Sequence, residues 1–550
     1  MKKYIILSLL GLTAISCRLD DNLNPNKVLA EQVTPDLRLS GASTDAYRVL
    51  AGNGLTVNAT GNGAGMNALG NAWTNTWSGN FAQYGNPFTT ESDLDITTTY
   101  RQSIFTDSYK AVTRFQRIID AGTQYANYVA IAKIQKAFYM QYVVDLYGDV
   151  PYTEAFKEAD NPTPAYDKDV NVYKGLVQEL MDAKSLIGTY GTNSSYQVAA
   201  SSDPIFKGNM TSWNQFANTV LLKFAVRLSN TTNADGIALR NQIISALAGA
   251  TFISSDVAIN PGYASSTAAA QNPLYNAFGQ FTSAGSSNTN GYLLMTASDH
   301  AIKTLQGHTS KPTNGVSDPR IAYIFTTGKM YNNTAAGGAT GYYGYPQGMS
   351  NDDYKVFMGY TVNDRKPVIG NFSFLAGIYN TPTATGSAAS GYLMMRAESE
   401  LLQSEAALRG YTGFSGAQAH FENAVKASFA FDYPKTGTGP ADAATAATAY
   451  ITAITANPKV GWTGTIDNKI AAIQYQRWVA LMAYNGAESY INYLRTGYPE
   501  TPLATTATKA NKPWRLLYPA DEYSTNGANT PVVSQADCFT KNATTPFIYK

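Results

Sequence analysis

The chain has 550 residues, of which 44% are hydrophobic and only 14% charged, and its formal net charge is +1. This composition is typical of a globular protein with a large core and excludes an intrinsically disordered chain. Near-neutrality also argues against a nucleic-acid partner, because phosphates require clustered lysine and arginine. The only cysteines are Cys17 and Cys538, so the fold depends on packing and not on a disulfide framework.

The first residues predict an export signal. Lys2 and Lys3 precede an almost wholly apolar run over residues 4–14, and small residues then lead to Cys17. This pattern is typical of a secretory signal, and the run is shorter than the ~20 residues that a membrane-spanning helix needs. A cysteine in this place resembles the lipobox of bacterial lipoproteins, although Ala14 stands where that pattern prefers leucine. The alternative is an ordinary secreted protein that is cut nearby.

These features divide the chain. We expect residues 1–17 to be a lipoprotein signal whose Cys17 carries the lipid anchor, residues 18–30 to be a tether, and residues 31–550 to form one body. The acidic pair Asp20 and Asp21 resembles signals that send some lipoproteins to the outer face of the outer membrane. A simple solvated linker explains the same residues equally well.

Apolar residues three and four apart predict helices in four windows of the body. A further helix is expected at about 468–484 and a weak one at about 441–456, whereas strand signals are few and short. Small residues within the apolar faces allow helices to pack closely, and the helix pairs look like tetratricopeptide units without a strict repeat of roughly 34 residues. The predicted class is all-α dominated: one scaffold of tetratricopeptide-like helix pairs, with long loop inserts at about 254–291 and 326–390. The four apolar stripes are Ile131, Ile134, Phe138 and Tyr142; Tyr173, Leu176, Leu180, Ala183 and Ile187; Trp213, Ala217, Val220, Phe224 and Leu228; and Met394, Ala397, Leu401, Ser404 and Leu408.

Several short motifs, in order along the chain, resemble the SusD/RagB family of outer-membrane nutrient-binding lipoproteins. The strongest is AKIQKAFYMQYVVDLYGDVP over residues 132–151, in which Gly148 suits the left-handed geometry that closes a helix and Pro151 prevents its continuation. Individually weak, the motifs form a specific set together with the lipobox. The others are Leu23-Asn24-Pro25-Asn26 with Val33–Leu37, Met395–Glu398, Gln403–Ala406, Gln476-Arg477-Trp478, Asn485-Gly486, Arg495-Thr496-Gly497, Arg515, Tyr518-Pro519, Glu522 and Asn526.

The motif residues themselves are expected to build the scaffold. For Arg396, Glu398, Glu405 and Arg477 the favoured interpretation is ion pairing and capping between packed helices. Residues 147–151 are likewise expected to form a corner of the scaffold and not a binding site.

The resemblance implies a binding protein and not an enzyme. Family members sit over a TonB-dependent (SusC-like) transporter and capture oligosaccharides or other nutrients at the cell surface. A lipid-anchored outer-membrane location, no cofactor and no nucleic-acid partner follow from it. Some relatives carry structural calcium, but no ligands are assigned here. The alternatives are a lid that binds peptides or another nutrient and, less favoured, a glycoside hydrolase.

A sugar site requires flat aromatic faces flanked by polar groups. Trp73 and Trp77 would share one face if their segment is helical, and Tyr84 follows soon after. The favoured alternative makes both tryptophans core anchors. Other candidates lie in the two inserts, where loop packing is the competing explanation for each ring: Tyr263, Tyr275, Tyr292, Tyr342, Tyr343 and Tyr345.

Catalytic motifs give no support for an enzyme. The three histidines, His300, His308 and His420, form no HExxH arrangement, and the sequence has no G-x-S-x-G elbow and no P-loop. A glycosidase needs only two suitably placed carboxylates, which 39 acidic residues could supply. The absence of a catalytic motif and the family resemblance favour binding without chemistry.

Overall fold

Helices dominate the computed structural model, which describes residues 33–52, 54–55, 65–79, 88–286, 289–334, 336–432 and 442–550. Its strands form four small antiparallel sheets of two strands each, and no larger sheet is present in this part of the chain. The predicted class, an all-α dominated scaffold of tetratricopeptide-like helix pairs with few short strands, is confirmed. The division into signal, tether and single body stays a prediction.

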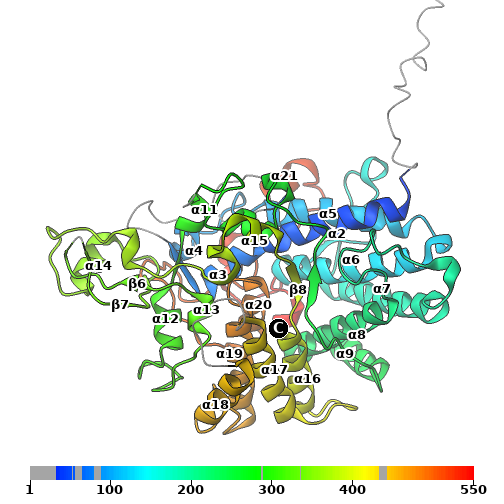
Figure 1. The fold of residues 1–550 in the computed structure, drawn as a ribbon. Helices are drawn as coiled ribbons and strands as arrows, with labels where there is room; N and C mark the ends of the chain where they lie inside the picture. Colours follow the sequence, from blue (N-terminus) through cyan, green and yellow to red (C-terminus); the bar gives the residue numbers. More distant parts are fainter. Residues whose placement is uncertain are drawn as a thin grey trace, which may run out of the picture.

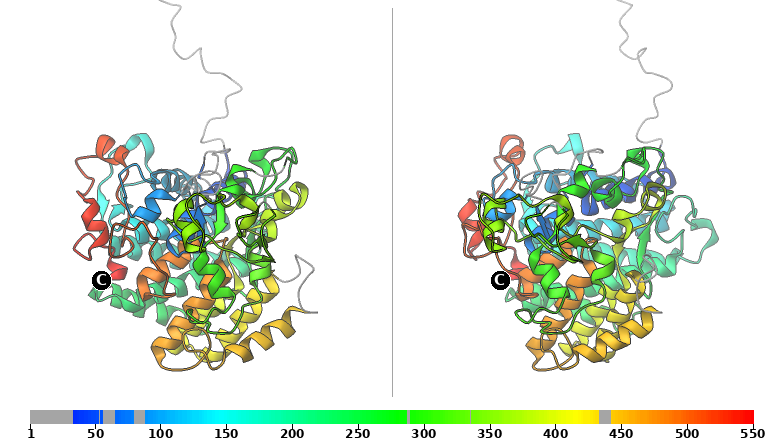
Figure 2. Two further views of the ribbon diagram at one scale, coloured as in Figure 1. Left: turned by 90° about the vertical axis from the view of Figure 1, so that its left-hand side faces the viewer. Right: turned by 60° about the vertical axis from the view of Figure 1, so that its left-hand side comes forward.

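Two groups of long helices build the scaffold (Figure 1). The first group packs in sequence order at one side of the molecule, and the second forms its lower part, as both views of Figure 2 show. The groups meet where α8 packs against α16. The first group is α5 (Ser103–Ile119), α6 (Ala126–Tyr147), α7 (Asp169–Tyr190), α8 (Met210–Arg227) and α9 (Ala234–Ala246). The second is α16 (Arg396–Leu408), α17 (Ala417–Asp432), α18 (Ala443–Ile454), α19 (Ile466–Leu481) and α20 (Gly486–Thr496).

Shorter elements complete the fold. Helices α2 (Pro35–Ala51) and α3 (Met66–Trp73) pack on α5 and α20, respectively. The remaining helices are α4 (Thr89–Asp93), α10 (Pro273–Phe278), α11 (Asn290–Leu293), α12 (Asp299–Leu305), α13 (Ile321–Ile324), α14 (Asn351–Phe357), α15 (Thr383–Ala388), α21 (Ala520–Thr525) and α22 (Gln535–Phe539). The strand pairs are β1 (Trp77–Gly79) with β5 (Met295–Ala297), β2 (Val150–Pro151) with β3 (Tyr166–Asp167), β4 (Val257–Ile259) with β8 (Gly391–Met394), and β6 (Gly328–Lys329) with β7 (Thr340–Gly341).

The apolar stripes predicted from the sequence lie on α6, α7, α8 and α16, except that Leu228 directly follows α8 and Met394 ends strand β8. The two further helices are α18 and α19. The stripe predicted on α6 covers only one face of that helix, whereas the structure buries α6 on nearly every side. Neighbours on several sides cover it, including α5, α7, α8 and α2. Helix α6 is therefore the central element of the first group.

A network of buried ion pairs joins the two helix groups. The Lys223 ammonium on α8 lies 2.6 Å from a Glu488 carboxylate oxygen on α20 and 3.3 Å from one of Glu398 on α16. On the same helix as Lys223, Arg227 contacts Asp145 of α6 at 3.0 Å and Glu488 at 2.8 Å. All five side chains are almost completely shielded from solvent. Charges desolvated to this degree require partners, so the network fixes how the groups dock.

The motif charges serve the scaffold, as expected from the sequence. Glu405 binds Arg495 through two hydrogen bonds, and Arg477 donates to the side-chain amide oxygen of Asn492 at 2.7 Å. Arg396 takes a weaker part, since its half-exposed guanidinium lies 3.9 Å from Glu400. Glu405 and Arg477 therefore hold helices together and are buried, whereas Arg396 pairs only within its own helix.

The corner at residues 147–151 ends α6. Gly148 has a φ of +78°, and its backbone N–H donates to the Val144 carbonyl, which closes the helix. Pro151 then enters β2, and the Tyr518 hydroxyl donates to the Asp149 carbonyl at 2.6 Å. A glycine is needed here because positive φ is costly for residues with a Cβ.

The two inserts are not structureless. They contain short strands and helices, and the second includes a lobe around α14 that protrudes at the left of Figure 1. Tyr331, Tyr345, Tyr354 and Phe372 form a separate small core inside this lobe. The sequence missed these elements because each is too short to show a periodicity.

Candidate ligand-binding site

A cavity of about 230 Å³ lies between α12, α14 and the loop at residues 342–344. Its apolar wall includes the exposed side of Phe357, which is 52% accessible, and Met330, which is 38% accessible. Tyr342 and Tyr343 line it from the loop, and Tyr354 lines it from α14. We call this cavity the α12–α14 pocket. It offers open aromatic surface next to polar groups.

Local sequence signals position the walls of the pocket. Ser298 caps α12, with its hydroxyl accepting from the Ala301 N–H, and Ser350 caps α14 by accepting from the Asp353 N–H. A Cβ at Gly344 would lie 2.3 Å from the Ser298 carbonyl oxygen. Only glycine therefore lets the loop at residues 342–344 lie against the start of α12. The loop is thereby held beside both helices.

Polar groups occupy one side of the α12–α14 pocket. The Lys303 ammonium pairs with Asp299 one turn earlier at 2.8 Å and lies 5.3 Å from the centre of the Phe357 ring. The Gln306 amide donates to the Tyr342 carbonyl at 3.3 Å. Burial raises the pKa of Tyr342 and Tyr354, so both hydroxyls stay protonated at neutral pH. The side therefore presents a carboxylate, an ammonium and an amide to a bound molecule.

A family model described as "Starch-binding associating with outer membrane", SusD-like type, matches residues 56–519. The chain belongs to the SusD-like family. Its fold is also similar to solved structures of low sequence identity, whereas a search of curated proteins found no match.

Three solved structures illustrate the likeness. A chitin-binding SusD homolog from Flavobacterium johnsoniae is 20% identical with a TM-score of 0.65, covering 89% of this chain and 94% of that one. A putative outer membrane protein of Bacteroides vulgatus, described as probably involved in nutrient binding, is 22% identical with a TM-score of 0.66, covering 90% and 95%. A SusD homolog from Bacteroides fragilis is 19% identical with a TM-score of 0.65, covering 90% and 95%.

The structure of this SusD-like protein separates the aromatic candidates. Tyr342 and Tyr343 lie in the α12–α14 pocket, but Tyr345 is fully buried and stacks on Tyr354 with ring centres 4.9 Å apart. Tyr275 and Tyr292 are also buried. Tyr84 and Cys17, the predicted lipid anchor, lie outside the described residues.

Trp73 and Trp77 are buried core residues, in agreement with the alternative stated for them. Trp73 ends α3, whereas Trp77 begins β1, so the two do not share a helical face as the sequence suggested. Trp73 packs on Tyr490 with ring centres 4.9 Å apart, and Trp77 packs on Phe278 at 5.1 Å. Neither ring offers a face to a ligand in this conformation.

Sequence reasoning missed eight of the residues that line the pocket. They come from α12 and its C-terminal cap, from the segment after β6, and from α14 and the residue after it: Asp299, Ile302, Lys303, Gln306, Met330, Tyr354, Phe357 and Met358. One signal was available, because Val356, Phe357 and Met358 interrupt a polar, loop-like segment with three apolar residues in a row. Their exposure could not be read from that pattern.

Neither a metal site nor a membrane span is found in the described part of the chain. No group of three or more potential metal-ligating side chains comes together there. Helices long and apolar enough to cross a bilayer are also absent from the described residues.

Burial lowers the pKa of His300, whose Nδ1 lies 3.0 Å from the Lys311 ammonium, which is consistent with a neutral, structural imidazole.

Proposed function

We propose that this SusD-like protein captures an oligosaccharide at the cell surface in the α12–α14 pocket. It would then deliver the sugar, chemically unchanged, to a SusC-like TonB-dependent transporter of the outer membrane. The observation that carries the proposal is the exposed Phe357 ring in a pocket that Tyr343 also lines, with the Lys303 ammonium of the Asp299–Lys303 pair 5.3 Å from the centre of that ring.

The chemistry of this pocket suits a sugar. A pyranose ring has an apolar C–H face, which can stack on Phe357 or Tyr343, and hydroxyl groups around its edge. Asp299 and Gln306 can accept hydrogen bonds from those hydroxyls, while Lys303 and Gln306 can donate to them. The paired carboxylate and ammonium leave little net charge for a charged ligand. A neutral polyhydroxyl ligand is therefore favoured over an anion or a cation.

The family supports the proposed location and partner. Its description associates it with the outer membrane and with starch, and one structurally similar protein is described as chitin-binding. We propose that Cys17 carries the lipid that holds the protein at that membrane. Capture without catalysis agrees with this assignment.

The test is a calorimetric titration of the purified full chain with malto-oligosaccharides, chito-oligosaccharides and, as a contrast, peptides. Tyr343→Ala and Phe357→Ala should each weaken binding by roughly fivefold or more, because each removes one stacking face worth about 1 kcal/mol. Tyr196→Ala is the matched control, because Tyr196 is only partly exposed, like Tyr343, and lies in a 3₁₀ turn beyond α7.

Each outcome is informative. Saccharide binding that both pocket variants weaken and the control leaves intact supports the proposal. Binding of peptides alone would contradict the oligosaccharide assignment, and saccharide binding that both variants leave unchanged would remove the α12–α14 pocket as its site. For the partner, purification of the lipidated chain from outer membranes should recover a TonB-dependent transporter in about equimolar amount, and recovery without one would refute the pairing.

A further inference from the structure

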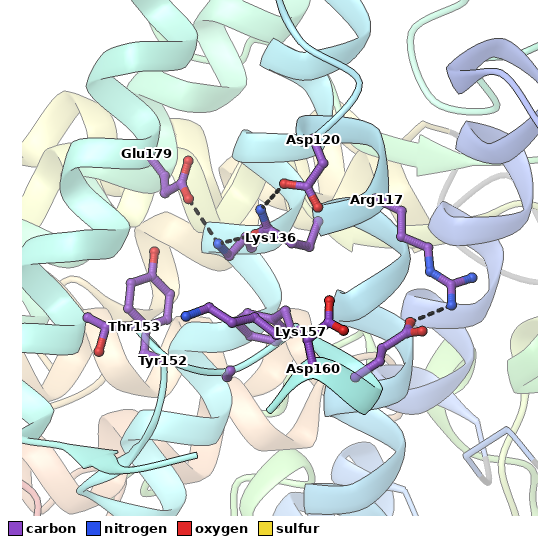
Figure 3. A pocket seen from close by; sticks show the side chains of 12 residues that line it. Arg117, Asp120, Lys136, Tyr152, Thr153, Lys157, Asp160 and Glu179 are labelled. Atoms are coloured by element: carbon purple, nitrogen blue, oxygen red, sulfur yellow. Dashed lines mark hydrogen bonds and ion pairs between the residues drawn. The ribbon is translucent and has the colours of Figure 1, made fainter. Parts of the chain in front are cut away.

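A cavity larger than the α12–α14 pocket lies elsewhere in the described part of the chain. A cavity of about 530 Å³ lies between α5, α6, α7 and the loop at residues 152–160 (Figure 3). We call it the helical-side cavity. Figure 1 shows α7 and α14 at opposite sides of the molecule, so the two cavities are well separated. Nothing in the proposed capture role uses this second cavity.

A polar network forms one wall of the helical-side cavity. The Lys136 ammonium on α6 donates to the Gln116 side-chain oxygen at 2.7 Å and to Glu179 at 2.9 Å, and the Gln116 amide donates to Asp120 at 2.8 Å. Lys136 is 95% shielded from solvent, but it lines the cavity. Its ammonium lies 4.9 Å from the centre of the Tyr152 ring, which lines the cavity as well. Fixed donors and acceptors thus stand next to an aromatic ring.

The loop that closes the cavity is held in a costly backbone conformation. Phe156 has a φ of +67° and Glu158 a φ of +51°, a region that residues with a Cβ rarely adopt. Contacts hold both in place, since Phe156 stacks on Tyr109 with ring centres 5.7 Å apart and Glu158 pairs with Arg117. Such strain persists where the surroundings over-determine it and clusters at functional sites. The loop is therefore shaped to present its side chains in one arrangement.

Two charged groups at the rim, the Lys157 ammonium and the Asp160 carboxylate, make no hydrogen bond or ion pair within the described residues, and Figure 3 shows both beside the cavity. Both side chains are exposed, and Lys157 has only an electrostatic attraction to the exposed Glu154 carboxylate. Thr153 also lines the cavity, but its hydroxyl already has a protein partner, because it donates to Asp167 at 2.8 Å. Lys157 and Asp160 are therefore the groups that a ligand would engage first.

The charges around the cavity select the class of ligand. Three cationic side chains (Arg117, Lys136 and Lys157) face four anionic ones (Asp120, Glu158, Asp160 and Glu179). This near-balance disfavours a phosphate, which needs an excess of cations, and equally a free cation. A neutral molecule with many hydroxyl groups matches alternating donors and acceptors, and its apolar face matches the rings of Tyr152 and Phe156.

We propose that the helical-side cavity is a second saccharide-binding site, independent of the α12–α14 pocket. Tyr152 and Phe156 would contact the sugar face, and Lys136, Lys157, Asp120 and Asp160 would bind its hydroxyls. A chain with sites on two opposite sides could hold one long glycan, or two glycans, at once. The proposal stands whether or not the α12–α14 pocket binds a sugar.

Hydrogen–deuterium exchange of the full chain with maltohexaose and N-acetylchitohexaose locates the site. We expect slower exchange over residues 152–160, in the wild type and also in the Tyr343→Ala/Phe357→Ala variant. The Lys157→Ala/Asp160→Ala variant should bind at this site about tenfold more weakly, since it loses charge-assisted hydrogen bonds. Folding should be unaffected because both side chains are exposed and make no hydrogen bond or ion pair within the described residues. Lys426→Ala, an exposed lysine on α17, is the control.

Absence of protection at residues 152–160 with both saturating saccharides would overturn the second site. Protection that disappears in the Tyr343→Ala/Phe357→Ala variant would also overturn it, because the signal would then come from the first pocket. Protection at 152–160 without any change around α12 and α14 would support the second site while refuting the first. The two proposals therefore fail in distinguishable ways.

Discussion

The ion pair between Glu405 on α16 and Arg495 on α20 allows a quantitative test of the scaffold. Two parallel bonds join them, Nη1 to Oε1 at 2.5 Å and Nη2 to Oε2 at 2.8 Å. Glu405 also accepts from Arg409 at 2.9 Å and from the Gln474 amide at 3.0 Å. Both members of the pair are shielded from solvent. Glu405 therefore satisfies four donor groups from three elements.

Glu405→Ala should lower the free energy of unfolding by about 3–5 kcal/mol, because it leaves the Arg495 guanidinium buried without its counter-charge. Glu405→Gln should cost less, since its carbonyl oxygen still accepts one bond from Arg495. The control is Glu500→Ala, which breaks an exposed pair with Lys459 at 2.6 Å. Exposed pairs contribute about 1 kcal/mol at most, so the control should stay below that value.

Equilibrium urea unfolding, followed by far-UV circular dichroism and tryptophan fluorescence, measures these differences. A loss below about 1 kcal/mol for Glu405→Ala would refute the argument, because the pair could not then be desolvated. The pH dependence gives a second check. Arg495 lowers the pKa of Glu405, so the contribution of this carboxylate is present above its unfolded pKa of about 4.3 and is lost as pH falls through the folded pKa. The wild type should therefore lose its advantage over Glu405→Gln only below about pH 4.

Two further changes test close packing and a buried charge. Gly70→Ala should destabilise the protein by about 2 kcal/mol or more, because its Cβ would lie 2.0 Å from the Gly486 backbone where α3 meets α20. Gly41→Ala on α2, with no atom within 4 Å, should instead stabilise it by about 0.5–1 kcal/mol, and equal melting shifts for the two would contradict this reasoning. Burial lowers the pKa of Lys512 to about 7, below its unfolded value of about 10.4, so the unfolded chain binds more protons between these values and stability rises with pH there. Lys512→Met should accordingly exceed the wild type in unfolding free energy by more at pH 7 than at pH 9, and a constant difference would show that Lys512 keeps its proton.

Much of the scaffold could be predicted from the sequence because its signals are local. The apolar spacing along residues 131–142 marks α6, and Gly148 with Pro151 marks its end, since helix periodicity and backbone restrictions act over a few residues. The role of Glu405 was also predictable, because a carboxylate on an apolar helix face is buried and requires a cationic partner. Its actual partner, Arg495, was not, because it comes from a distant part of the chain.

The binding surface depended on tertiary structure. Trp77 and Tyr343 are both aromatic residues in polar, glycine-containing segments, and nothing in their neighbourhoods distinguishes them. Phe278, far along the chain, covers the fully buried Trp77, whereas Phe357 stays 52% exposed although the Tyr354 ring centre lies 6.2 Å from its own. The exposure of an aromatic ring depends on which segments, distant in the sequence, pack over it. The local spacing of residues does not predict those contacts.

The sequence by itself thus determined the long helices, the corner that ends α6 and the need to pair buried charges, because each is set by neighbours within a few turns. Only the tertiary structure decided which aromatic rings face solvent, which charges meet, and where the two cavities lie. The α12–α14 pocket and the helical-side cavity are each assembled from segments separated along the chain. Their chemistry exists only once the helices have docked.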